Sequence, residues 1–212
     1  MRMGAPVPKQ FLLLRGRPVL AHTLQCFAAP GLAVREVVVV LPKSEMETWQ
    51  RLCREHSITL PHRLVAGGES RWASVKAGLA ALKRYPSGLV AVHDGVRPLV
   101  SAAVIERTYA AAATHAAAAA AVLPKDSVRQ LSQQGSVALN RQRLRLMQTP
   151  QTFDLDLLRR AYALPELSTF TDDATVVDDL CRVQLVEGDY RNLKITTPED
   201  LLLAEALLAS NG

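Results

Sequence analysis

The sequence predicts an α/β domain with a mostly parallel β-sheet that helices cover on both faces. Short apolar runs alternate along the chain with segments of helical period, as in repeated strand–helix units. The apolar runs are continuous rather than alternating, which indicates strands buried on both faces. The length of 212 residues suits one ordinary domain with a substantial core. We therefore treat residues 1–212 as a single domain.

Five apolar runs are the predicted strands. They are Val34–Leu41, Arg63–Val65, Leu89–His93, Ala117–Leu123 and Val183–Glu187. Seven segments with helical spacing are the predicted helices. They are Val19–Ala28, Met46–His56, Ser70–Lys83, Ala102–Thr114, Leu155–Tyr162, Asp173–Leu180 and Pro198–Ala209. In the alanine-rich stretch 110–121, we assign helix up to about His115 and strand after it.

The last helix has the clearest start signal. Thr197 is suited to cap it, Pro198 fits the first turn, and Glu199 and Asp200 place negative charge at the positive end of the helix dipole. The segment 127–146, SVRQLSQQGSVALNRQRLRL, instead alternates polar and apolar residues around a Gln-Gly turn. This pattern predicts a β-hairpin arm that projects from the sheet.

Composition and charge exclude several classes of protein. The net charge of +5 and the aromatic content of 5% are weak support for a nucleic-acid platform, whereas a small anionic substrate explains the slight positive excess. The three cysteines are far apart and form no CxxC motif, so we expect a reducing, cytoplasmic setting. No apolar stretch has membrane-spanning length, and no secretory signal pattern is present.

Candidate functional residues follow two of the predicted strands. In open α/β sheets, ligands bind beyond the carboxyl ends of the strands. Asp94 and Arg97 lie at such an end, and Gly68 and Glu69 lie at another, where glycines allow close approach of a ligand to the backbone. The alternatives are a turn aspartate at position 94 and a surface ion pair at Arg97.

Other polar residues have plain structural interpretations when taken alone. Lys194 fits a solvated surface, and Arg2 and Lys9 fit a basic terminus. Arginines at positions 141, 143 and 145 would share one face of a strand and protect an exposed edge. The five histidines are isolated, and most acidic residues near position 175 fit a helix start. Common phosphate-loop, dinucleotide, metalloprotease and hydrolase signatures are absent.

Taken together, seven motifs resemble one family across essentially the whole chain. The motifs are RMG…PKQF, GGESRWASVKAGL, VHDGVRP, PKDSVR, NRQRLRLMQTPQTF, TFTDDATVVD and VEGDYRNLKITTPEDL. Their order and spacing are similar to those of 2-C-methyl-D-erythritol 4-phosphate cytidylyltransferases. The resemblance implies a Rossmann-like nucleotidyltransferase fold and a homodimer formed through a β-arm at 127–146. The implied reaction transfers CMP from CTP to methylerythritol phosphate in isoprenoid biosynthesis.

The resemblance also implies roles for individual residues. Arg2, Lys9 and Lys194 match the cations that act on the triphosphate and the transition state. The matches to nucleotide-binding positions are Gly68, Glu69, Ser74, Asp94 and Gly95, with Asp94 also serving Mg²⁺. The matches to positions that bind the acceptor are Asp94, Arg97, Ser127, Arg141, Thr149 and Thr171. Of these, Ser127 and Arg141 are expected to reach the partner's site.

The implied chemistry explains these residue types. Because two anionic phosphates must approach each other, the protein has to position the groups and neutralise their charge. A phosphate monoester is already ionised near neutral pH, so no general base is required. Two alternatives stay open: a ribitol-5-phosphate cytidylyltransferase, and a truncated, non-catalytic nucleotide-binding homodimer. DNA or RNA binding is the least favoured role.

The chain departs from the family pattern mainly at its start. The family begins with a buried strand and an Ala-Ala-Gly-x-Gly loop, whereas this sequence starts at Met1, where that loop should be ending. We expect an upstream segment that supplies both. Glu69 stands where aspartate is frequent, and Ser127 replaces a threonine but keeps the hydroxyl group.

Overall fold

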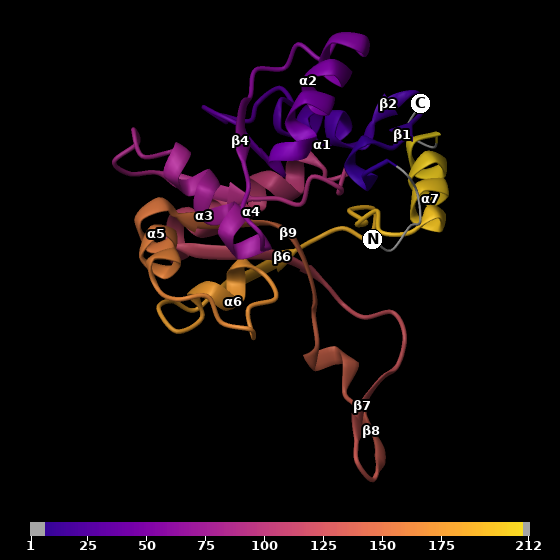
Figure 1. The fold of residues 1–212 in the computed structure, drawn as a ribbon. Coiled ribbons are helices and arrows are strands. Elements are labelled where there is room, and N and C mark those ends of the chain that lie inside the picture. Colours follow the sequence, from indigo (N-terminus) through magenta and orange to yellow (C-terminus); the bar gives the residue numbers. More distant parts are fainter. Residues whose placement is uncertain (1–6, 210–212) are drawn as a thin grey trace.

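The computed structural model describes residues 7–209 (Figure 1). Its strands are β1 (Leu13–Leu14), β2 (Arg17–Pro18), β3 (Val38–Leu41), β4 (Arg63–Ala66), β5 (Leu89–Val92), β6 (Ala117–Val122), β7 (Val128–Ser132), β8 (Gly135–Leu139), β9 (Leu146–Asp154) and β10 (Gln184–Glu187). Its α-helices are α1 (Val19–Phe27), α2 (Met46–Glu55), α3 (Arg71–Ala81), α4 (Ala102–His115), α5 (Leu155–Ala163), α6 (Asp173–Val177) and α7 (Pro198–Ala209).

The central sheet has the strand order β10-β6-β9-β5. Strand β10 runs parallel to β6, and β3 runs parallel to β4 in a separate pair. Strand β9 is antiparallel to both of its neighbours, so the central sheet is mixed. Strand β9 was not predicted from the sequence. Pro150 lies in the middle of it, and proline lacks the N–H group that a central strand normally donates.

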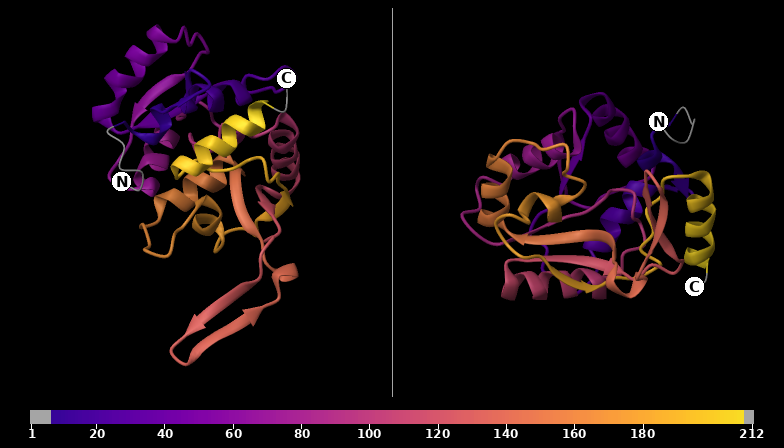
Figure 2. Two further views of the ribbon diagram at one scale, coloured as in Figure 1. Left: turned by 90° about the vertical axis from the view of Figure 1, so that its right-hand side faces the viewer. Right: turned by 90° about the horizontal axis from the view of Figure 1, so that it is seen from below.

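Helices cover both faces of this sheet, as predicted (Figure 2). On one face, α4 packs Val104 and Ile105 against Ala120 of β6. On the other face, α5 and α6 join a core cluster with Phe153 of β9 and Ala117 of β6. Six consecutive residues of β6 are buried, five of them alanines, so helices can approach this strand closely from both sides. The α/β class with a helix-covered sheet is confirmed.

All the predicted helices and strands are present, most of them with shifted ends. The alanine-rich stretch divides as expected, because α4 ends at His115 and β6 begins at Ala117. The predicted strand from Val34 starts only at Val38. The helix expected over Asp173–Leu180 ends at Val177, so that prediction was too long by three residues.

The predicted arm projects from the body as the β7–β8 hairpin (Figure 1). Its two-residue turn is Gln133-Gln134, one residue before the predicted Gln-Gly turn, and Gly135 opens β8 at a φ of 127°. Residues 141–143 form a short 3-10 helix between β8 and β9. The expectation that arginines 141, 143 and 145 share one face of a strand was therefore wrong.

Candidate active site

Asp94 lies two residues beyond the carboxyl end of β5 and faces three cations. Its Oδ2 atom is 3.0 Å from Nζ of Lys194 and 3.2 Å from Nε of Arg97. Its Oδ1 atom is 4.0 Å from Nε of Arg71. These cations come from three separate segments of the chain, so the fold has gathered them around one carboxylate.

The charges around Asp94 keep it ionised. Burial alone would raise the pKa of this carboxyl, but Lys194, Arg97 and Arg71 together hold it below its ordinary value. Arg97 is 9% exposed, and burial lowers its pKa while Asp94 favours its charged form. The interpretation of Arg97 as a surface ion pair was wrong, because this pair is largely buried.

His93 supports the Asp94 loop as a neutral side chain. Burial lowers its pKa to about 4. Its Nε2 atom lies 3.2 Å from the carbonyl oxygen of Arg97, which can only accept, so Nε2 carries the proton. The other ring nitrogen then accepts a hydrogen bond from the Thr149 hydroxyl over 3.1 Å. Thr149 in turn accepts one from the backbone N–H of Asp94 over 3.0 Å.

A bulge in β9 directs polar side chains into the site. Ala119 pairs with Gln151 and Ala121 pairs with Met147, so three β9 residues lie opposite Ala120 alone. Bulges of this kind redirect side chains beside active sites. The Gln148 side-chain amide donates to the carbonyl oxygen of Asp189 over 2.8 Å and so binds the loop that leads to Lys194.

Gln151 ties β9 to the start of α6. Its amide donates to Asp172 Oδ2 over 2.7 Å, and its oxygen accepts from the backbone N–H of Ala174 over 2.8 Å. Asp172 caps α6 in a capping box with Thr175. The loop that carries Thr171 is thus fixed to the central sheet.

These segments line a cavity of about 240 Å³ that is open to solvent. The residues that line it are Arg71, Asp94, Arg97, Met147, Gln148, Thr149, Gln151, Thr171, Asp172 and Lys194. Five of them are predicted site residues, namely Asp94, Arg97, Thr149, Thr171 and Lys194. The remaining polar members are residues that the sequence analysis did not single out.

Other predicted site residues lie outside this lining. Gly68 and Glu69 are in the β4–α3 connection, and Ser74 is on α3. Lys9 is exposed on a short 3-10 helix. Gly95 lies next to Asp94, where its carbonyl oxygen accepts from the Thr23 hydroxyl.

Ser127 and Arg141 are at the base of the arm, where Arg141 donates to the backbone oxygen of Lys125. Arg2 lies outside the described residues.

Four polar side chains of the cavity were missed: Arg71, Gln148, Gln151 and Asp172. The sequence carries a signal for the two glutamines, since both interrupt an otherwise apolar or small run that leads into a helix. Arg71 and Asp172 lie in the quoted family-like motifs, but nothing in the sequence shows that they line the same cavity.

The backbone around Lys194 is anchored by α7. Asp200 Oδ2 accepts hydrogen bonds from the backbone N–H groups of Thr196 and Thr197, each over 2.8 Å. It also accepts from the Thr196 hydroxyl over 2.8 Å. Ile195, between Lys194 and this turn, is fully buried and donates its N–H to Val96 O over 2.9 Å.

Replacing Asp200 with alanine is expected to lower the free energy of unfolding by about 1 kcal/mol at pH 7. Burial would raise the pKa of Asp200, but the hydrogen bonds from Thr196 and Thr197 lower it below its unfolded value. The stabilisation is therefore present above about pH 4 and is lost as the pH falls through the folded-state pKa. Denaturant unfolding at pH 7 and pH 3 measures this. The exposed Asp156→Ala is the control, and an equal loss at both pH values would contradict the prediction.

The described residues contain no cluster of three or more histidine, cysteine or acidic side chains that could hold a metal ion unaided. Asp94 and Asp172 are the two carboxylates in the cavity lining. One or two carboxylates together with substrate phosphates are the usual Mg²⁺ ligands. The donor set thus fits a Mg²⁺ ion that arrives with a nucleotide.

The chain was compared with known families and proteins. Residues 1–210 match the family model for 2-C-methyl-D-erythritol 4-phosphate cytidylyltransferase (IspD). A protein of that name from Bacteroides thetaiotaomicron is 44% identical over 209 residues, covering 98% of this chain and 94% of that protein. One from Porphyromonas gingivalis is 46% identical over 213 residues, covering 99% and 93%.

Solved structures of proteins with these names are also similar to this chain. The 4-diphosphocytidyl-2C-methyl-D-erythritol synthase of Anaerococcus prevotii superposes with a TM-score of 0.83 at 30% identity, covering 98% of this chain and 93% of that chain. The 2-C-methyl-D-erythritol 4-phosphate cytidylyltransferase of Thermus thermophilus gives a TM-score of 0.77 at 34% identity, covering 97% and 96%. Within residues 7–209, no helix is both long and apolar enough to cross a membrane.

Proposed function

The chain belongs to the 2-C-methyl-D-erythritol 4-phosphate cytidylyltransferase family, and we propose that the cavity around Asp94 is where it transfers CMP from CTP to 2-C-methyl-D-erythritol 4-phosphate. It is a nucleotidyltransferase of isoprenoid biosynthesis. One phosphate oxygen of the acceptor forms a bond to the α-phosphorus of CTP, and the bond from that phosphorus to pyrophosphate breaks. The observation that carries the site assignment is the convergence of Lys194, Arg97 and Arg71 on Asp94.

The cations of this site serve to bring two anions together. Lys194 pairs with Asp94 in the free protein and is 41% exposed, so it can turn towards the α-phosphate of bound CTP. Arg97 stays in place because it also donates to the carbonyl oxygen of Asn192 over 2.7 Å. Electrostatic groups that are fixed before the reaction stabilise charge that develops in the transition state. Lys9 and Arg2 would act on the remaining phosphates.

The two substrates would occupy opposite sides of Asp94. Gly68, Glu69 and Ser74 would hold the cytidine, and Thr149 and Thr171 would contact the acceptor. Mg²⁺, held by Asp94 and the nucleotide, would neutralise phosphate charge. All three cysteines are free, which agrees with the cytoplasmic setting that we propose.

Turnover of the purified chain tests this assignment. Pyrophosphate release is measured with CTP, Mg²⁺ and methylerythritol 4-phosphate, and ribitol 5-phosphate is the comparison acceptor. We expect release with the first acceptor and much slower release with the second. Nucleotide binding without any release would instead favour a non-catalytic protein, and preference for ribitol 5-phosphate would overturn the acceptor assignment.

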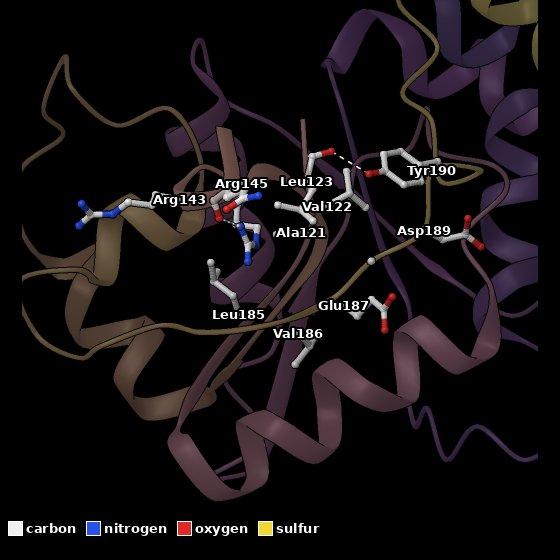
Figure 3. Close-up of a pocket in the computed structure, with 12 residues that line it drawn as sticks. Ala121, Val122, Leu123, Arg143, Arg145, Leu185, Val186, Glu187, Asp189 and Tyr190 are labelled. Atoms are coloured by element: carbon white, nitrogen blue, oxygen red, sulfur yellow. Dashed lines mark hydrogen bonds between the residues drawn. The ribbon is translucent and has the colours of Figure 1, made fainter. Parts of the chain in front are cut away.

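We propose that two copies of this catalytic domain, residues 1–212, form a homodimer through the arm 127–146. Leu131 and Val137 on the arm are 82% and 62% exposed, which suits burial against a second copy. A cleft of about 860 Å³ opens at the arm's base (Figure 3). The cleft offers a partner arm both apolar and charged contacts, from Leu123, Leu185, Tyr190, Arg143, Arg145, Glu187 and Asp189.

In such a dimer, Ser127 and Arg141 would complete the partner's acceptor site. Arg141 is exposed and supplies a guanidinium group, which binds phosphate through two parallel hydrogen bonds. The backbone contact of Arg141 with Lys125 O fixes the side chain near the arm's base. The dimer's molar mass by sedimentation is the first check, because a monomer at micromolar concentration would contradict it.

Replacing Arg141 with alanine is expected to raise the apparent KM for the sugar phosphate at least ~10-fold and to leave that for CTP nearly unchanged. Equal changes in both KM values would contradict this role. Mixing Arg141→Ala subunits with inactive Asp94→Asn subunits tests the sharing directly. In an equal mixture, half of the dimers contain one subunit of each variant. If sites are shared, one of the two sites in each mixed dimer has both wild-type Asp94 and wild-type Arg141, so about a quarter of all sites regain wild-type composition. No recovery after subunit exchange would reject shared sites.

A further inference from the structure

We propose that Arg71 is a positioning residue, which holds the Asp94 carboxylate in fixed relation to the segment 171–173 during transfer. This inference rests on the proposed function and adds to it a residue outside the set that we matched to the family. Arg71 lines the same cavity as Asp94 and Thr171. Its guanidinium group contacts carboxylates that are far apart in the chain.

The start of α3 places Arg71 at this point. Arg71 is the first residue of the helix, and the Ser70 hydroxyl caps it by accepting from the N–H of Ala73. The preceding turn is tight, since a Cβ atom on Gly68 would lie 2.5 Å from Cβ of Ala73. The backbone before Arg71 therefore has little freedom, and the connection that carries Gly68 leads to Arg71 at the edge of the cavity.

One edge of the guanidinium group is anchored in the core. Its Nη2 atom donates to Oδ2 of Asp173, which is fully buried. The other oxygen of Asp173 accepts from the Tyr162 hydroxyl over 2.6 Å. Trp72 stacks on the Tyr162 ring with a centroid distance of 5.5 Å. A buried carboxylate needs both partners, so Arg71 is held firmly against α5 and α6.

The other side of Arg71 faces Asp94. Its Nε atom is 4.0 Å from Asp94 Oδ1, whereas Lys194 and Arg97 both contact Oδ2. When Lys194 turns towards the α-phosphate, Asp94 loses its shortest ion pair. Arg71 cannot follow, because Asp173 anchors it. It therefore keeps the carboxylate aligned and keeps the Thr171 segment at a fixed distance from it.

The variant Arg71→Lys tests this role. Lysine keeps the positive charge that buried Asp173 needs, but a single ammonium group cannot contact two carboxylates on opposite sides as a planar guanidinium does. We expect the melting temperature to stay within a few degrees of wild type. We expect kcat to fall ~10-fold and the KM for the sugar phosphate to rise ~10-fold, with the KM for CTP changed less than ~2-fold.

Two further variants complete the experiment. Arg84→Lys is the matched control, because Arg84 lies just after α3 and pairs with Glu36 over 2.9 Å outside the cavity. Tyr162→Phe keeps every charge but removes one anchor of Asp173, so it should shift the same constants in the same direction by a smaller factor.

Wild-type kinetics in a folded Arg71→Lys protein would overturn the proposal. If Arg71→Lys does not fold, wild-type kinetics in a folded Tyr162→Phe protein would overturn the proposal instead. Absence of turnover in the wild-type protein would instead reject the proposed function, and this inference with it.

Discussion

Replacing Lys194 with methionine is expected to lower kcat by about 100-fold or more, because the variant lacks the cation that we propose stabilises the charge developing on the α-phosphate. Lys194 is already aimed into the cavity by its 3.0 Å contact with Asp94. Methionine keeps most of the side-chain length and removes only the charge. The effect should appear in kcat more than in either KM, since the contact strengthens in the transition state.

Stability should change little in this variant. Lys194 is 41% exposed, and ion pairs in that setting contribute at most ~1 kcal/mol. Lys76→Met is the matched control, because Lys76 is an exposed lysine on α3 that lies over the Trp72 ring. Steady-state kinetics and thermal melts of both variants make the comparison. A Lys194→Met enzyme within a few-fold of the control would remove Lys194 from the reaction.

Local sequence patterns predicted those parts of the site that are formed by one strand and the residues that follow it. Asp94 and Arg97 were found because two charged residues lie in the short segment after an apolar run. The helix Pro198–Ala209 was predicted with its final bounds, because its start signals lie within four consecutive residues. The hairpin arm was likewise predicted from alternation around a turn.

Contacts between distant segments could not be predicted in this way. Arg71 and Asp173 are 102 positions apart, and no local sequence pattern indicates that they form a pair. Strand β9 was not predicted, and its proline contradicts the local rule, while the bulge in the β6–β9 ladder is visible only once β6 is its neighbour. The burial that converts Arg97 from a surface residue into a fixed cation is likewise a property of the assembled fold.

Replacing Asp94 with asparagine is expected to have the largest effect of all, a loss of kcat/KM on the order of 1000-fold. Asparagine keeps the shape of the side chain but removes the one negative charge that Lys194, Arg97 and Arg71 share. It would also remove the proposed Mg²⁺ ligand and the proposed contact to the acceptor. Because Arg97 is largely buried, losing its partner should also lower the free energy of unfolding by ~3 kcal/mol.

Binding of anions separates the loss of chemistry from general damage to the site. Without Asp94, Lys194 and Arg97 lose the carboxylate that neutralises them, while Arg71 keeps its pair with Asp173. Pyrophosphate, measured by calorimetry without metal, should therefore bind as tightly as to wild type, or more tightly. The control is Asp156→Asn on α5, an exposed carboxylate paired with Arg160 over 3.2 Å. An Asp94→Asn protein that loses pyrophosphate affinity together with turnover would indicate a collapsed site. One that keeps turnover within ~10-fold of wild type would show that Asp94 is not required for catalysis.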